Sequence, residues 1–132
     1  MLFRSSVYVH VKRSLLVPFL LGFDLAETDR STPVRFSTTQ PTQALGMLNS
    51  DFLNDRAARL AEKVVQEVGT DSRRQVRRIL SLVASRPPTE LEVSRGLGLI
   101  DRLMHEDGLP FQVALSSFCL MALNLNEFLY LD

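Results

Sequence analysis

The sequence predicts a mainly α-helical fold, an irregular bundle of about five or six helices around a buried C-terminal helix, with one short N-terminal β-strand. Between residues 51 and 125, stretches with apolar residues at helical spacing alternate with capping residues, glycines and prolines. The last stretch, 110–125, is apolar on nearly all sides, which is typical of a helix enclosed by its neighbours. The length of 132 residues suits a single domain over 1–132 with a sizeable core.

Residues 1–38 are expected to form a strand, a short helix and a loop. Apolar residues alternate with other types over Ser6–Val11, which predicts a strand. Residues 15–23 can form a short helix with Pro18 in its first turn, where proline is tolerated. Residues 24–38 show no period and are interpreted as a loop. No second convincing strand follows, so the strand lacks an obvious partner in this sequence.

The helical core is expected over residues 39–132. Pro41 marks the entry of a first short helix, because proline fits the first helical turn. An apolar stripe predicts a long helix over Asp51–Val68, capped by Ser50 and closed by Gly69 in the left-handed conformation.

Asp71 is expected to cap the next helix, whose apolar stripe consists of Val76, Ile79, Leu80 and Val83. That helix should end near Ser85, because the residue before a proline disfavours the helical conformation and Pro87 follows Arg86.

Thr89 and Glu92 form a capping-box pattern that opens a further helix. Each of its two glycines, Gly96 and Gly98, costs about 1 kcal/mol of helix stability relative to alanine, so we expect them to allow close approach of a neighbour. Gly108 should close this helix before the central one begins. After that central helix, Asn126 is expected to cap one last turn.

The charge balance and the single cysteine argue against several functions. Lys plus Arg and Asp plus Glu both number 15, so the formal net charge is zero and offers no general attraction to nucleic acid or anionic membrane. Cys119 is expected to be a small core residue, and no CxxC or CxxCH spacing exists for zinc or haem. His105, Glu106 and Asp107 point in different directions at a helix end. We therefore expect no metal site, no cofactor and no catalytic residues in this chain.

A basic segment before an apolar one imitates an export signal at the N-terminus. The apolar run Leu15–Leu21 is interrupted by Pro18, and no A-x-A cleavage pattern follows it. We therefore favour the absence of a working signal peptide. No run is long enough, or free enough of polar residues, to span a bilayer.

Two sets of polar residues are candidates for binding. The first is a basic face at helical spacing, made of Arg73, Arg74, Arg77 and Arg78. It could meet phosphates, but acidic residues lie near it and no aromatic residues are interleaved, so an ion-paired solvent face is favoured over nucleic-acid binding.

The second set lies in the predicted loops and helix ends of the N-terminal third: Lys12, Arg13, Asp24, Arg35, Thr38, Thr39, Gln43 and Asn49. A polar network that holds the loop to the helices is favoured, because buried loop backbone needs hydrogen-bond partners. A ligand site is the alternative.

An ordered series of motifs runs through the chain: SVYVHVKR at 6–13, FD at 23–24, TTQPTQAL at 38–45 with LN at 48–49, SRPPTE at 85–90 and NLNEFLYLD at 124–132. Together they resemble the C-terminal part of a planctomycete-type domain family of unknown function, the PSD1 C-terminal domain (DUF1553). The family usually has glycine where this chain has Ser85, and the haem-attachment motif of its longer members does not occur in this sequence.

The resemblance implies the C-terminal part of a larger protein, because family members are typically large, exported and equipped with c-type cytochrome-like domains. The family offers no established catalytic residues to transfer. We therefore expect a non-catalytic structural or interaction module whose partners are upstream domains or another protein. If upstream domains have been cut away, an exposed apolar patch is expected, through which the chain could self-associate. The alternative is a ligand or catalytic site, for example for a carbohydrate, that upstream domains complete.

Overall fold

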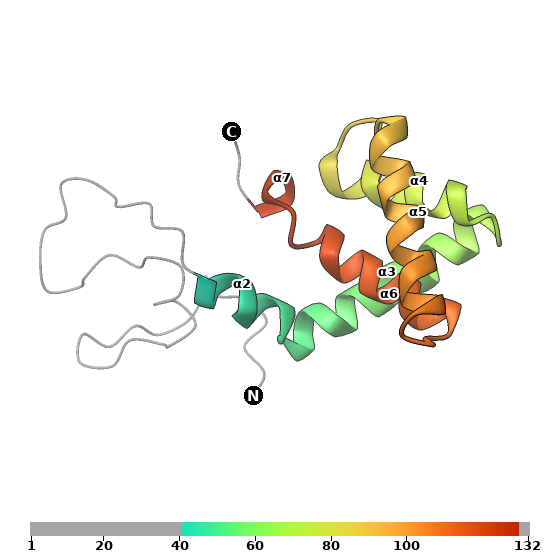
Figure 1. Cartoon of the computed structure of the whole chain (residues 1–132). Helices are drawn as coiled ribbons and strands as arrows, with labels where there is room; N and C mark the ends of the chain where they lie inside the picture. The colour runs from blue at the N-terminus through green and yellow to red at the C-terminus, as the bar shows by residue number, and fades with distance from the viewer. Residues whose placement is uncertain (1–40, 130–132) are drawn as a thin grey trace, which may run out of the picture. The chain divides into compact units, whose positions relative to one another are not determined.

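The computed structural model describes the backbone of residues 41–129 and the side chains of residues 45–129 (Figure 1). The chain divides into two compact units, Met1–Gly46 and Met47–Asp132. The described part consists of six helices: α2 (Pro41–Leu48), α3 (Asp51–Val68), α4 (Ser72–Ala84), α5 (Glu90–His105), α6 (Phe111–Ala122) and α7 (Asn126–Leu129). The mainly helical class is therefore confirmed. The predicted strand, short helix and loop before residue 39 lie outside the described residues, and the single domain over 1–132 stays a prediction.

Helices α3 and α4 begin and end where the sequence indicates. Gly69 closes α3 with a φ of 76°, which costs glycine little because it has no Cβ. Asp71 caps α4, since its carboxylate accepts hydrogen bonds from the backbone N–H groups of Arg73 at 2.9 Å and Arg74 at 3.2 Å. The turn between these helices is further fixed by the fully buried Gln75, whose Nε2 donates to the Gly69 carbonyl.

The connection between α4 and α5 contains a left-handed residue that is not glycine. Ser85 follows the last residue of α4 and has a φ of 53°. A left-handed conformation brings Cβ close to the following carbonyl oxygen and costs a residue with a side chain about 1–2 kcal/mol. This geometry gives a physical reason for glycine at this position in proteins that share the turn.

Thr89 and Glu92 form the predicted capping box at the start of α5. The Glu92 carboxylate accepts from the Thr89 backbone N–H at 2.7 Å, and the Thr89 hydroxyl oxygen accepts from the Glu92 N–H at 3.3 Å. Two amides that have no partner within the helix are thereby satisfied.

The core forms around α6, which packs against α3, α5 and α4. In Figure 1, α5 runs steeply across the direction of α6, and a short turn over residues 106–110 connects the two helices. Phe118 is the largest of the fully buried side chains, and complete burial of a phenylalanine contributes roughly 1.5–3 kcal/mol. The remaining buried residues of α6 are Ala114, Leu115, Cys119 and Ala122. The central place predicted for this helix is therefore confirmed.

Four details of the expectation were wrong. Helix α6 is not enclosed on all sides, because Val113 is 46% exposed. Ser50 lies at the N-cap position of α3 but makes no side-chain capping hydrogen bond; instead, Asn54 Nδ2 donates to the Ser50 carbonyl at 3.0 Å. Asn126 is the first residue of α7 and not its cap. A Cβ added at Gly98 would meet nothing within 4 Å, so no neighbour approaches closely there.

Candidate functional site

A cleft of about 1020 Å³ lies in the second unit, between α5 and the stretch from the end of α6 into α7. Its apolar lining comes from three helices and the α6–α7 connection: Leu80, Leu99, Phe118, Met121 and Leu125. Its polar lining consists of Glu92, Arg95, Arg102, Asn124, Asn126 and Glu127. The cleft therefore joins an apolar floor to a charged rim, which is the usual character of a binding site.

The two glycines of α5 both line the cleft, and they shape it differently. At Gly96 an added Cβ would lie 2.7 Å from Val76 Cγ1 and 2.9 Å from Phe118 Cε2, so the missing side chain lets α5 press against the core. At Gly98 the same addition meets open space. Gly98 therefore leaves room in the cleft, and a larger residue there would fill part of it without displacing the core.

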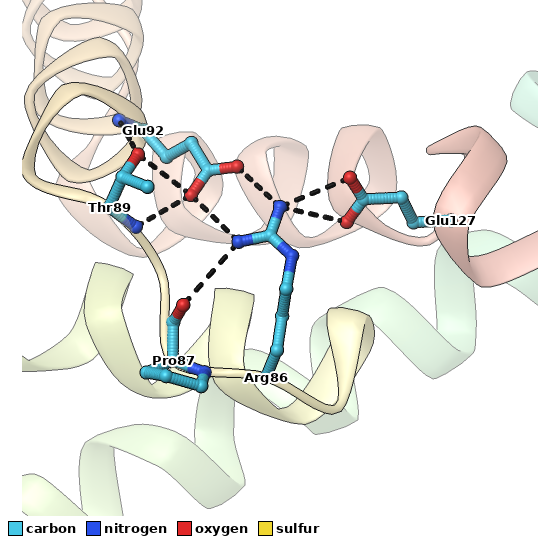
Figure 2. Close-up of polar contacts among 5 residues, drawn as sticks. All are labelled: Arg86, Pro87, Thr89, Glu92 and Glu127. Carbon is cyan, nitrogen blue, oxygen red and sulfur yellow. Dashed lines mark hydrogen bonds and ion pairs between the residues drawn. The ribbon is translucent and has the colours of Figure 1, made fainter.

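Two carboxylates that line the cleft, those of Glu92 and Glu127, are held by an arginine that joins three segments (Figure 2). The Arg86 guanidinium lies between the carboxylates of Glu92, at the start of α5, and Glu127, in α7. It donates to Glu92 at 2.6 and 3.1 Å and to Glu127 at 3.0 and 3.1 Å. Because Glu127 is 41 residues away in sequence, this arginine ties α7 to the connection between α4 and α5.

These contacts favour the charged forms of Glu92 and Arg86. Hydrogen bonds from Arg86, and then from the Thr89 backbone, lower the pKa of Glu92 from 4.5 to about 2. Hydrogen bonds to Glu92 and Glu127 raise the pKa of Arg86 above its ordinary value. Glu92 is therefore ionised throughout the physiological range, and its carboxylate is already occupied by donors.

Two cations on the cleft rim differ from every other cation in the described part of the chain. Arg95 and Arg102 line the cleft, are exposed, and form no ion pair with any carboxylate of residues 45–129. Each remaining Arg or Lys in that range lies within 3.8 Å of a carboxylate oxygen. Arg102 Nε instead donates to the Gly98 carbonyl at 3.4 Å. Arg95 and Arg102 are thus cations of the cleft lining that have no ion-pair partner in residues 45–129.

Asn124 adds a polar group to the same cleft. Its Nδ2 donates to the Leu120 carbonyl at 2.8 Å, and its Oδ1 is buried without a hydrogen-bond partner in the described residues. A buried acceptor with no donor costs about 1–3 kcal/mol, so this oxygen favours a donor from solvent or from a ligand.

Each arginine of the predicted basic face of α4 is paired with a carboxylate. Arg73 and Arg77 both contact Glu90 of α5, and Arg78 donates to Glu67 of α3 at 2.9 Å. Arg74 lies 3.5 Å from the carboxylate of Asp71. Hydrogen bonds from Arg77, then Arg73, lower the pKa of Glu90, and the Arg78 hydrogen bond lowers that of Glu67. This arrangement supports an ion-paired face that links helices and leaves little free charge for phosphate.

Neither Cys119 nor His105 lines the cleft. Cys119 is fully buried, and loss of hydration raises the pKa of its thiol to about 12, so the reactive thiolate form is suppressed. His105 is exposed, and its Nδ1 lies 2.8 Å from the Asp101 carbonyl one turn earlier. No group of three or more potential metal ligands occurs within the described residues.

Of the predicted polar set in the N-terminal third, the structure describes the side chain of Asn49 alone. The side chains of Lys12, Arg13, Asp24, Arg35, Thr38, Thr39 and Gln43 lie outside the described residues. Gln43 belongs to α2 by its backbone, and Asn49, directly after that helix, is exposed. Both interpretations of this set, polar network and ligand site, therefore stay predictions.

Sequence reasoning singled out Glu92, Gly96 and Gly98 as features of one helix, but it did not identify the cleft that they line or the basic residues beside them. Arg86 was visible only as the residue before a proline, although SRPPTE at 85–90 and NLNEFLYLD at 124–132 are the two motifs that the Arg86–Glu127 pair brings together. Arg95 and Arg102 are spaced seven residues apart, which places them on one side of a helix two turns apart. That spacing could have identified the basic rim. Nothing in the sequence indicates that Gly98 faces open space.

In the part of the chain that the structure describes, no helix combines the length and apolar character needed to cross a bilayer.

No curated protein and no solved structure matches the sequence. The sequence model of one family, PSD1, described as a protein of unknown function (DUF1553), matches residues 1–100. The matched part includes the bridging Arg86 and Glu92 and ends within α5, so the motif at 124–132 lies beyond it. Because the match covers well over half of the 132 residues, the chain belongs to the PSD1 family of proteins of unknown function (DUF1553).

Proposed function

We propose that this chain is a non-catalytic interaction module and that the cleft between α5 and the α6–α7 stretch receives a segment of a partner protein. One observation carries the proposal: the cleft is open and has a largely apolar lining, while the carboxylates of Glu92 and Glu127 in that lining are bound by Arg86. Covering apolar surface with a partner is favourable by about 25 cal/mol per Å² removed from water. A cleft of this kind therefore favours association.

The pKa values of the nearby groups argue against catalysis at this cleft. General acid–base catalysis works best with a group whose pKa lies near the working pH. Glu92, with a pKa of about 2, is far below that range, and its oxygens already accept hydrogen bonds. Cys119, with a pKa of about 12, is neutral and buried. Both groups suit a structural role.

The partner class follows from the family resemblance. Longer members carry domains before this one, and such domains are the first candidates to cover the cleft. The test is a sedimentation-velocity titration of this chain with the upstream domains of a longer family member. We expect a complex for the unchanged chain and a loss of affinity of about tenfold for Gly98→Leu, because the added side chain occupies the cleft.

Ser94→Leu is the matched control for that titration. Ser94 is exposed on the same helix and does not line the cleft, so the same side chain added there should leave the affinity unchanged. Absence of a complex, or equal affinity of both variants, would contradict the proposed function.

Two alternatives make different predictions. If Asp24 and Gln43 belong to a ligand site, substituting them should abolish binding or turnover while folding stays intact; if they belong to a polar network, folding itself should fail. Nucleic-acid binding through the basic face of α4 predicts retention on heparin that falls steeply with salt. The carboxylate partners of Arg73, Arg77 and Arg78 support elution at modest salt instead.

A further inference from the structure

We propose that the occupant of the cleft is an amphipathic helix of a partner protein, with its apolar side chains on the cleft floor and its carboxylates against Arg95 and Arg102. This inference rests on the proposed function and names the chemistry of the partner.

The charge of the rim selects an acidic partner. Glu92 and Glu127 also line the cleft, but neither forms an ion pair with Arg95 or Arg102, because their carboxylates are bound by Arg86. Arg95 and Arg102 therefore have no ion-pair partner in residues 45–129, and the three arginines exceed the two carboxylates by one positive charge. An exposed guanidinium binds a carboxylate well, because its planar donors match the two oxygens. A basic helix in the same place would bring like charges next to Arg95 and Arg102.

The spacing of these arginines fits the repeat of a helix. Seven residues of α-helix span about 10 Å, so Arg95 and Arg102 lie along one side of α5 roughly two turns apart. A partner helix that lies along α5 presents side chains at the same interval. Acidic residues seven apart on the partner would therefore meet both guanidinium groups at once.

The floor suits apolar anchors of such a helix. Leu99, Met121 and Leu125 line the cleft and are only partly buried, so their remaining surface is available to a partner. Methionine adapts its shape to different apolar groups, which is useful on a binding surface. Gly98 has no side chain and open space beyond it, so the backbone of a partner can approach α5 closely.

The walls favour a helix over an extended segment. They are built from α4, α5, α6 and α7, whose backbone groups are bonded within the helices. An extended peptide would bring its own backbone N–H and C=O groups into the cleft and would find no strand edge to pair with. A helix satisfies these groups internally and places apolar residues at three- and four-residue intervals on one face.

The experiment uses the full chain and two labelled synthetic peptides of about 20 residues, long enough to form helix. Both have leucines on one face, and they differ only at two flanking positions seven apart, which are Glu in the acidic peptide and Lys in the basic one. Fluorescence anisotropy measures the affinity of each peptide. We expect the acidic peptide to bind about tenfold more tightly, and Arg95→Glu combined with Arg102→Glu to reverse that preference.

The matched control is Arg56→Glu combined with Arg59→Glu. It changes the net charge equally but acts on exposed residues of α3 that do not line the cleft, so the acidic preference should persist. A preference lost equally in both double variants would reflect net charge alone and would overturn the inference.

The remaining outcomes separate the inference from the proposed function. Equal binding of the two peptides, with loss of both on Gly98→Leu, would overturn the acidic partner and leave the cleft as a docking site. Binding that does not respond to Gly98→Leu would overturn both. Dimerisation of the free chain that Gly98→Leu abolishes would identify a second copy as the occupant and overturn the acidic helix.

Discussion

Helix α5 has two glycines two residues apart, and they lie in opposite surroundings. Gly96 is buried, and Val76 and Phe118 leave no room for a Cβ; Gly98 is exposed, with nothing in the space where its Cβ would be. Since glycine weakens a helix by about 1 kcal/mol relative to alanine at either place, each position needs its own explanation.

The difference indicates that the two sides of α5 have different roles, one in core packing and one in the cleft. The Gly96 side joins α5 to α4 and α6, and the absence of a side chain there is required for core packing. The Gly98 side keeps the cleft open, and the absence of a side chain there contributes nothing to packing that the structure shows. If this distinction holds, substitutions on the core side should change stability, and those on the open side should change binding.

The largest effect is expected in α6, the helix against which the core side of α5 packs. Replacing the fully buried Phe118 with alanine should destabilise the chain by about 3–5 kcal/mol, because it removes apolar contacts and leaves a cavity. Val113→Ala, at a position 46% exposed in the same helix, should change stability by less than about 0.5 kcal/mol. Urea denaturation of both variants is the measurement, and similar losses would contradict the packing described.

Alanine at each glycine of α5 tests the comparison itself. Gly96→Ala should destabilise by about 1–3 kcal/mol, because the new Cβ would lie 2.7 Å from Val76 Cγ1. Gly98→Ala should stabilise by up to about 1 kcal/mol through helix propensity alone. Thermal unfolding of the pair should therefore give shifts of opposite sign, whereas shifts of the same sign would show that both sides are packed alike.

A smaller gain in stability is expected in the turn that leads into α5. Ser85→Gly should stabilise by about 0.5–1 kcal/mol, because the relief of a left-handed serine exceeds the extra freedom that glycine gives the unfolded chain. Ser85→Ala is the control, since it keeps the strain and should bring no gain. Urea denaturation measures the stability of Ser85→Gly and Ser85→Ala. Equal stability of the two variants would contradict the backbone strain at Ser85.

The smallest effect is expected for Glu92→Gln, which removes the ionisable partner of Arg86 and should change how stability depends on pH. Because the pKa of Glu92 is depressed to about 2, its ionisation stabilises the fold above about pH 4.5, and this contribution is lost as the pH falls towards 2. Glu92→Gln keeps an oxygen for the capping box but cannot ionise. The wild type should therefore melt higher than the variant at neutral pH, with the gap closing near pH 2. A gap that stays constant with pH would contradict the lowered pKa.

The local features of the fold could be predicted from the sequence because each depends on neighbouring residues. Asp71, Thr89 with Glu92, and Gly69 act within one or two turns of their own helix, and all three sites were predicted. The apolar stripe of α4 was predicted for the same reason. Ser50 shows the limit of this reasoning, since a suitable residue at the right position makes no capping bond there.

The candidate cleft could not be predicted, because it depends on contacts between segments far apart in the chain. The Arg86–Glu127 pair spans 41 residues, and no local pattern connects its members. Gly96 and Gly98 look alike in sequence, and the positions of Val76 on α4 and Phe118 on α6 separate their roles. Similarly, Val113 belongs to an apolar helix but faces outward, since the neighbours of α6 do not surround it.

A NOESY spectrum of the labelled chain tests the central claim, the unequal sides of α5, most directly. The packing predicts strong cross-peaks from the Gly96 Hα protons to the Phe118 ring and the Val76 methyl groups, and none from the Gly98 Hα protons to side chains of other helices. Cross-peaks from Gly98 to side chains of α6, in the free monomeric chain, would mean that the cleft is closed and would contradict the account.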